Sequence, residues 1–311
     1  MDRSTALHLY ESMWLTRLVE ERLVQLYRQG QTIGSIYRSL GQEATACATA
    51  MALGSEDVIG PLIRNLGSML VRGVTPEEIF LQYLGRAAGP TGGREHNNHF
   101  GSVKRGIIAP TSMLGALIPV MAGVALNFKQ KQQRRVAMTW IGDGGTSTGA
   151  FYEGLSFAAI QKLPLIVVAE ANGYAYSTPT TKQMAVDLAD RAQGAYTMVV
   201  DGNDALQVYK AACQARDRCR AWLGPVFLVC QTFRLSGHAE HDDQRYVDPE
   251  LLNQWTQKDP IPRFESWLEA QGWKPEKSSF DQLKQQIEEA VERALEIPFP
   301  DPDTLREGVF A

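Results

Sequence analysis

The middle of the chain alternates short apolar runs with helix-like segments, and this alternation restricts the fold more than any other feature of the sequence. Residues 135–141 and 165–169 read as buried strands, with a helix expected between them over 149–162. The pattern repeats further on, with strands at 198–200 and 225–232. Apolar strands that alternate with helices predict an α/β fold, in which a mostly parallel sheet carries helices on both faces.

Helical segments flank this core on both sides. Apolar residues recur at three- and four-residue intervals over 5–29, and Gly30 supplies a stop. The end of the chain is charged, helical in pattern and interrupted by prolines. We therefore expect one domain over 1–311, with an N-terminal helical extension in 1–55, a core in 56–250 and a helical C-terminal tail in 251–311.

A long loop separates two further helices. Thr75-Pro-Glu-Glu78 combines a capping threonine, a proline at the first helical position and a glutamate three residues after the cap, which predicts a helix over 76–86. An apolar helix is expected over 114–128. Residues 89–112 show neither a helical nor a strand periodicity of apolar residues, so they are expected to form a loop. A loop of this length is uncommon in a compact domain unless it has a function.

Composition narrows the class of protein. The net charge of -4 and pI near 5.8 give no electrostatic footprint for nucleic acid. The four cysteines show no CxxC spacing, which favours reduced, buried thiols. No basic-then-apolar leader and no long apolar window is present. We expect a cytoplasmic protein that binds neither nucleic acid nor membrane.

The turn Gly142-Asp-Gly-Gly145 joins a predicted strand to a predicted helix. Bare backbone N–H groups at a helix N-terminus attract phosphate, but a carboxylate at the centre of the turn should repel it. Asp143 belongs there if a divalent cation lies between the carboxylate and the phosphate, and Mg²⁺ prefers such hard oxygen ligands.

A second oxygen ligand is available at the end of the next strand. Asn172 follows Asp143 by 29 residues (143 to 172), and the ends of adjacent parallel strands lie about 5 Å apart. Taken singly, Gly-Asp-Gly and Asn-Gly are common turns. Their occurrence at successive strand ends favours a shared metal site.

With these residues, the chain resembles the alpha subunit of the thiamine-diphosphate-dependent 2-oxo acid dehydrogenase decarboxylating component. The likeness covers nearly the whole sequence. Besides the glycine turn and Asn172-Gly-Tyr-Ala, it rests on Ser39-Leu-Gly-Gln-Glu-Ala44, Arg72–Ile79, Ile118-Pro119, Val200–Asp204 and Phe233–His238. It implies the thiamine-diphosphate-binding fold of the diphosphate-binding type.

The resemblance also implies a role for individual residues. Asp143, the Asn172 side chain and the Tyr174 carbonyl would bind Mg²⁺. His238 would reach the diphosphate and the reacting centre, where a neutral imidazole can exchange a proton. The remaining cofactor contacts would come from Arg64, Leu114, Gly142, Gly144 and Gly145.

The implied reaction is oxidative decarboxylation of a 2-oxo acid, with transfer of the acyl group to a lipoyl arm on an acyltransferase core. In the family the carboxylate that activates the aminopyrimidine ring is on a beta subunit, so we expect activity only in an α2β2 heterotetramer. Pyruvate and branched-chain 2-oxo acids are both open as substrates, and an acetoin dehydrogenase alpha subunit is an alternative.

The histidines suggest a rival function. His96 and His99 share HxxH spacing with His238 and His241, and histidines with nearby carboxylates can build a zinc hydrolase site. Both pairs lie in glycine-flanked loops without an HExxH signature. Two blander hypotheses also stay open at this point: that the histidine loop is simply solvated, and that the chain is a non-catalytic nucleotide-binding protein.

The chain departs from the family pattern in places. Ala171 and Ile63 replace an asparagine and an aromatic residue, Ala239 excludes phosphorylation at that position, and Ala116 and Leu117 replace ligands of a potassium ion in some relatives.

Overall fold

The computed structural model describes residues 1–32, 34–273, 275 and 277–307. Its centre is a five-stranded sheet in which every neighbouring pair of strands is parallel. The strand order is β1 (Val58–Gly60), β2 (Ala137–Gly142), β3 (Leu165–Ala171), β7 (Val226–Gln231) and β6 (Tyr196–Asp201). The predicted α/β class and parallel sheet are confirmed.

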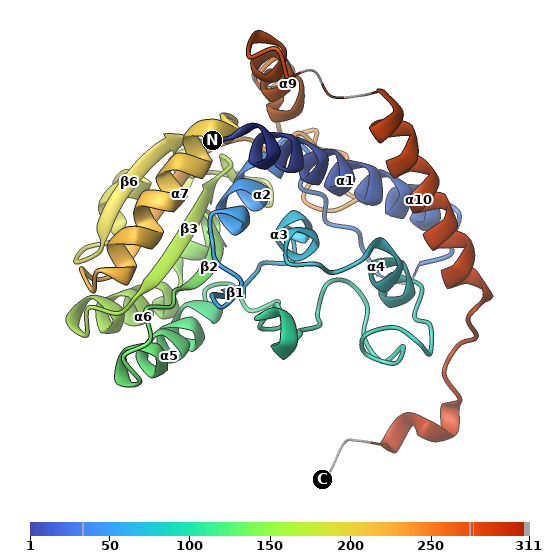
Figure 1. Ribbon diagram of the computed structural model, residues 1–311, viewed down its shortest axis with the longest axis horizontal. Helices are drawn as coiled ribbons and strands as arrows, with labels where there is room; N and C mark the ends of the chain where they lie inside the picture. Colours follow the sequence, from blue (N-terminus) through green and yellow to red (C-terminus); the bar gives the residue numbers. More distant parts are fainter. Residues whose placement is uncertain (33, 274, 276, 308–311) are drawn as a thin grey trace.

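Helices cover both faces of the sheet (Figure 1). α5 (Leu117–Gln130) and α6 (Gly149–Ile160) pack on one face, and α2 (Glu43–Met51) and α7 (Ala205–Arg220) on the other. Successive residues of a strand point to opposite faces. Met138 and Trp140 of β2 accordingly join the core of α2 and α7, whereas Ala137 and Ile141 join that of α5 and α6.

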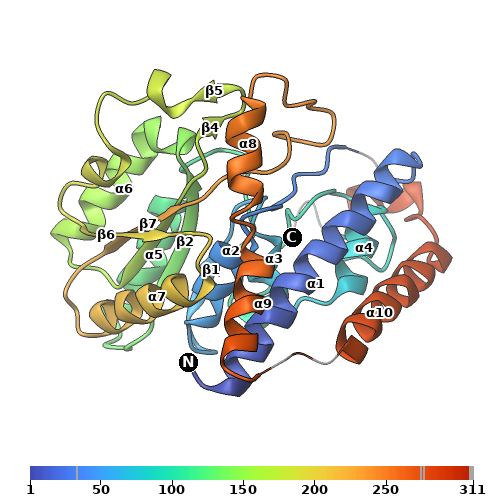
Figure 2. The same ribbon diagram turned by 90° about the horizontal axis from the view of Figure 1, so that it is seen from above.

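A second group of helices lies beside the sheet. α1 (Arg3–Arg28) runs along α9 (Pro260–Ala270) and α10 (Lys277–Glu296), and α10 also packs on α4 (Pro76–Tyr83) (Figure 2). α3 (Leu66–Val71) and α8 (Pro249–Thr256) complete the longer helices of the described chain. The described residues also contain five short 3-10 helices: η1 (Val103–Arg105), η2 (Gly144–Ser147), η3 (Thr180–Lys182), η4 (Leu188–Arg191) and η5 (Pro302–Arg306).

The C-terminal helices are part of the main core. Phe264 and Leu268 of α9 and Val291 of α10 are buried in the same apolar cluster as Leu9 of α1. Residues 33, 274, 276 and 308–311 of the expected helical segments lie outside the described residues. The three-part division at 55 and 250 stays a prediction.

Two helix boundaries differ from the prediction because of glycines. α4 begins with the predicted capping box at Thr75 but ends at Tyr83, and Gly85 follows with φ 63°. α5 begins at Leu117 rather than at 114, because Gly115 has φ 81°, a left-handed conformation that a helix does not contain. Leu114 consequently stands on a loop.

The hairpin of β4 (Tyr174–Ala175) and β5 (Thr178–Pro179) follows β3 directly. The four cysteines carry no disulfide, and all but Cys213 are buried. Within the described residues no helix has both the length and the apolar content to cross a bilayer.

Candidate functional site

Every site residue expected from the sequence lines one cavity of about 410 Å³ at the carboxyl ends of β2 and β3. Parallel sheets bind ligands at this edge. The lining includes Arg64, Leu114, Gly142, Asp143, Gly144, Gly145, Asn172, Tyr174 and His238. Their roles stay predictions, but segments distant in the sequence meet at one place.

Asp143 joins the ends of the two strands. Its carboxylate is 1% exposed and accepts hydrogen bonds from the Gly144 N–H at 2.7 Å and the Gly173 N–H at 2.8 Å. Burial raises the pKa of Asp143, and these two N–H donors oppose the rise. Asn172 Oδ1 lies 3.5 Å from the Tyr174 N–H, so the amide oxygen is held weakly on the same turn.

The glycines of the turn are required for different reasons. A Cβ on Gly144 would collide with the Ala175 Cβ, and one on Gly145 would approach Ile141 Cγ1 to 2.8 Å. A Cβ on Gly142 would meet nothing within 4 Å, although Gly142 lines the cavity. A side chain at 142 would therefore occupy space that a ligand needs.

Two buried arginines give the cavity its charge. Arg64 is 7% exposed and donates to the carbonyls of Arg38 at 2.7 Å and His238 at 2.9 Å. Arg234 is 3% exposed and donates to the Ser236 carbonyl and the Tyr246 hydroxyl. Among the described residues neither makes an ion pair with a carboxylate. Burial, together with Arg234, lowers the pKa of Arg64 to about 10, which an anion in the cavity would reverse.

His238 lies next to these cations. Its ring stands edge-on to Tyr37 at 5.4 Å between centroids and tilted against Tyr176 at 4.6 Å. Arg234 Nη1 is 3.5 Å from Nδ1. Burial, Arg64 and Arg234 lower the pKa of His238 to about 4. The imidazole is therefore neutral near pH 7.

The residues present fit a diphosphate bound with a divalent cation. Thr111 lines the cavity and its buried hydroxyl has no hydrogen-bond partner among the described residues. A buried hydroxyl in that condition is costly unless a ligand or water satisfies it. Within the described chain, the guanidiniums of Arg64 and Arg234 lack a carboxylate partner, and space is open beside Gly142. Together with the Thr111 hydroxyl, these features indicate a polar, anionic ligand.

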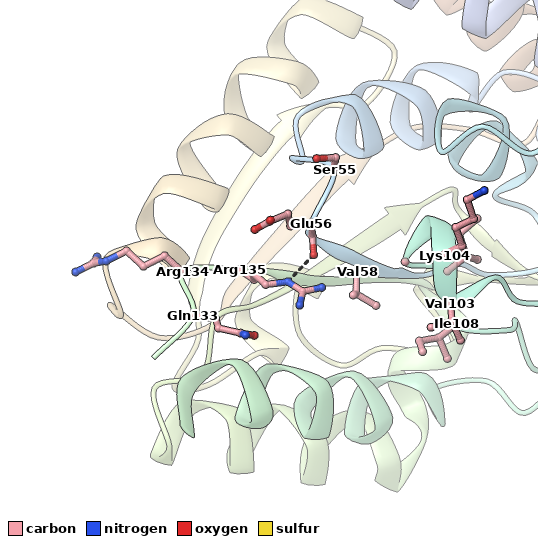
Figure 3. Close-up of a pocket in the computed structure, with 11 residues that line it drawn as sticks. Ser55, Glu56, Val58, Val103, Lys104, Ile108, Gln133, Arg134 and Arg135 are labelled. Carbon is pink, nitrogen blue, oxygen red and sulfur yellow. Dashed lines mark hydrogen bonds between the residues drawn. The ribbon is translucent and has the colours of Figure 1, made fainter. Parts of the chain in front are cut away.

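Another cavity, of about 610 Å³, lies at the opposite edge, where β1 and β2 begin (Figure 3). It is basic, but Arg134 is exposed and Arg135 is half-buried, whereas Arg64 and Arg234 are buried. Arg135 donates to the Glu56 carbonyl at 2.6 Å and stacks on Phe128, and Arg134 donates to the Arg220 carbonyl. This cavity offers no comparable set of reactive groups.

The family follows from comparison with known proteins. Residues 10–303 match the model of the dehydrogenase E1 component family. The chain belongs to this family.

Relatives agree along nearly the full length. The chain is 33% identical to the 2-oxoisovalerate dehydrogenase subunit alpha of Bacillus subtilis, over 98% of this chain and 95% of the relative. It is 37% identical to the pyruvate dehydrogenase E1 component subunit alpha of Bacillus cereus, over 97% and 81% respectively. The resemblance inferred from the motifs is confirmed, and the E1 component family depends on thiamine diphosphate.

The structure lends the zinc hypothesis no support. His99 contacts Glu95 and Ser112, whereas His241 contacts Ser35, so the two HxxH pairs have separate surroundings. Across the part of the chain that the structure describes, no group of three or more His, Cys, Asp or Glu side chains is placed to hold a metal ion.

Two of the departures from the E1 pattern lie at or beside the cavity. Ile63 lines the cavity and its carbonyl accepts from Asn98, and the Ala171 carbonyl accepts from the Thr232 N–H. Sequence reasoning missed Tyr37, Thr111 and Glu170 of the cavity wall. Only Glu170 left a signal, as a charged residue inside an otherwise apolar strand.

Proposed function

We propose that this chain is the alpha subunit of a 2-oxo acid dehydrogenase that binds thiamine diphosphate through Mg²⁺. One observation carries the proposal: the turn with Asp143, the strand end with Asn172 and the carboxylate-free Arg64 line a single cavity. A carboxylate and a cation on one wall suit a metal ion and a phosphate that bind together.

The metal ligands would be Asp143, Asn172 and the Tyr174 carbonyl. The present contacts support this set, because among the described residues the Asp143 carboxylate accepts only from main-chain N–H groups and Asn172 Oδ1 has one weak donor. A bound cation would also favour the ionised form of Asp143, whose pKa burial raises.

Arg64 would bind the diphosphate with its guanidinium, while Gly142, Gly144 and Gly145 provide main-chain approach. Leu114 would supply an apolar contact. It is 52% exposed and Met113 beside it is 66% exposed, so this chain alone leaves that wall open to water.

His238 would hold a proton at a defined atom. Arg234 Nη1 faces Nδ1, and an arginine can only donate, so Nδ1 accepts and Nε2 carries the proton of the neutral ring. His238 would therefore be a neutral donor near the reacting centre.

Thiamine diphosphate, when bound, supplies the electron sink for decarboxylation. The partner would be a beta subunit in an α2β2 heterotetramer, and the acyl group would pass to a lipoyl-bearing acyltransferase. Relatives named for 2-oxoisovalerate and for pyruvate support either substrate, and acetoin is the alternative.

The test is co-expression with a beta subunit of the same family, followed by assays of pyruvate, 2-oxoisovalerate and acetoin. We expect turnover of a 2-oxo acid that needs both thiamine diphosphate and Mg²⁺. An assembled complex that binds no thiamine diphosphate would contradict the proposal, and turnover of acetoin alone would favour the acetoin dehydrogenase hypothesis.

A further inference from the structure

A short irregular segment lies between α1 and α2, beside the cofactor cavity. We call residues 35–42 the strap. Its polar main-chain groups divide between two kinds of partner. Two N–H groups of the strap bind buried carboxylates. Four carbonyls accept from Arg64 of the cofactor cavity and from Thr232, Leu235 and Glu240, which precede and follow His238 in the chain.

The carboxylates hold the strap from the helices. Glu20 of α1 accepts from the Ser39 N–H and from the Ser39 hydroxyl, both at 2.8 Å. Glu43 of α2 accepts from the Gly41 N–H at 3.0 Å. Ser39 is 1% exposed, so these bonds are shielded from water.

The carbonyls hold the site. Arg38 O accepts from Arg64 Nη1 at 2.7 Å. Leu40 O accepts from the Leu235 N–H at 3.0 Å, and Ile36 O accepts from the Glu240 N–H at 3.0 Å. The last two bonds fix the chain on either side of His238.

Contact between the strap and the His238 loop is close. Gly41 has φ 87°, and a Cβ there would lie 2.7 Å from Leu235 Cγ and 2.9 Å from the Phe233 carbonyl oxygen. A displaced strap would therefore move the loop.

The two carboxylates differ in how their charge is balanced. Glu43 pairs with Arg17 at 2.8 Å, and Arg17 also binds Asp259. Glu20 is 3% exposed and makes no ion pair among the described residues, and its hydrogen bonds there come from Ser39. Burial, with Glu43 nearby, raises the pKa of Glu20 to about 8. Burying an acidic side chain without an ion pair costs folding free energy. In return, the two hydrogen bonds of Glu20 fix the position of Ser39.

We propose that Glu20 is a positioning residue for the cofactor site, because its bonds to Ser39 place the Arg38 carbonyl that holds Arg64 and the strap that holds the His238 loop. The inference rests on the proposed function. Outer partners of this kind orient the groups that touch a ligand and are needed for tight binding.

The test compares Glu20→Ala and Glu20→Gln in the assembled heterotetramer. The measurements are the thiamine diphosphate Kd, kcat and KM, with hydrogen exchange over residues 234–247. Glu20→Ala should raise the Kd about tenfold or more, as expected when hydrogen bonds to an acidic group are lost, and it should speed exchange in the loop. Glu20→Gln keeps an acceptor for the Ser39 N–H and should restore most of the affinity.

Asp57→Ala is the matched control. Asp57 is 0% exposed and accepts from the Val136 N–H at 2.8 Å and the Gly54 N–H at 2.7 Å, at the opposite edge of the sheet. Asp57→Ala should lower the Tm of the complex and leave its thiamine diphosphate Kd unchanged. Ser39→Ala, which removes only the hydroxyl bond, should give an intermediate Kd and covers the case in which Glu20→Ala does not fold.

Two results would overturn the inference. One is a Kd and a loop exchange rate in Glu20→Ala or Ser39→Ala that match wild type. The second is an equal effect of Glu20→Ala and Asp57→Ala on Kd, which would mean general destabilisation. Failure of the proposed function is distinct, because the wild-type complex would then bind no thiamine diphosphate.

Discussion

Arg64 and His238 show how single residues acquire their chemistry from burial. Arg64 is shielded from water, bound to two carbonyls and close to a second cation. A guanidinium in this condition gains an anion at low desolvation cost, since its own desolvation has already occurred on folding. The same cations keep His238 neutral.

Replacing Arg64 by Lys tests the anion site. The planar guanidinium of Arg64 binds the carbonyls of Arg38 and His238 and still has N–H groups for a phosphate. A lysine keeps the charge, but its single ammonium group cannot reach all three partners. We expect the thiamine diphosphate Kd to rise by about tenfold or more, as for a lost charge-assisted hydrogen bond. The control is Arg245→Lys, whose side chain is 87% exposed. Titration calorimetry on the assembled complexes measures the thiamine diphosphate Kd of both variants. The same Kd in Arg64→Lys and Arg245→Lys would contradict the role of Arg64.

The depressed pKa of His238 predicts a pH-dependent stability. The group has pKa 6.5 when unperturbed and about 4 in the folded chain, so between these values the unfolded state binds more protons. This contribution is present above pH 6.5 and is lost as pH falls toward 4. His238→Asn should therefore lose less stability than wild type over this interval in urea unfolding. Parallel stability curves would contradict the shift.

The sequence predicted which residues lie together where their spacing follows from regular secondary structure. Asp143 and Asn172 could be placed together because parallel strand ends are neighbours, and the register Gly142↔Glu170 confirms this adjacency. Thr111 and Tyr37 could not be placed at the site, because they lie on segments without a periodic pattern. Glu20 lies on a predicted helix, but its contact with Ser39 depends on how that helix packs against the strap.

At the scale of elements, the turn after β2 depends on two glycines in different ways. Gly144 packs against the β4 hairpin, whereas Gly142 faces open space in the cavity. Element types follow from apolar periodicity, but the ends of α4 and α5 follow from backbone conformation at Gly85 and Gly115.

The pair Gly142→Ala and Gly144→Ala separates binding from stability. Gly144→Ala should destabilise the fold by roughly 1–3 kcal/mol through overpacking against Ala175. Gly142→Ala should keep the wild-type Tm but weaken thiamine diphosphate binding, because its methyl group enters the cavity. Thermal unfolding and binding assays distinguish the two, and an unchanged Kd in Gly142→Ala would argue against a cofactor at this wall.

At the scale of the whole molecule, the site is built by one edge of the sheet and by the layer beside it. Sheet strands bring Asp143 and Asn172, while the strap between α1 and α2 holds Arg64. α/β alternation predicted the sheet. The packing of α9 and α10 into the core of α1 was not predictable, since it joins the two ends of the chain.

The open wall at Met113 and Leu114 leads to a prediction about assembly. The isolated chain should fold but show no decarboxylation of a 2-oxo acid with thiamine diphosphate and Mg²⁺, and a beta subunit should restore it. Activity assays before and after mixing, with size-exclusion chromatography, measure this. Full activity of the isolated chain would contradict a divided active site.

Asp143 is proposed to bind the diphosphate through a metal ion. The most direct test is Asp143→Asn in the assembled complex, because the amide keeps an acceptor for the Gly144 or Gly173 N–H and removes the charge. The control is Asp243→Asn, whose side chain is 58% exposed. Calorimetric titration with thiamine diphosphate, with and without Mg²⁺, should show that Asp143→Asn has lost Mg²⁺-dependent binding while the control binds as wild type. Unchanged Mg²⁺-dependent binding in Asp143→Asn would contradict the claim.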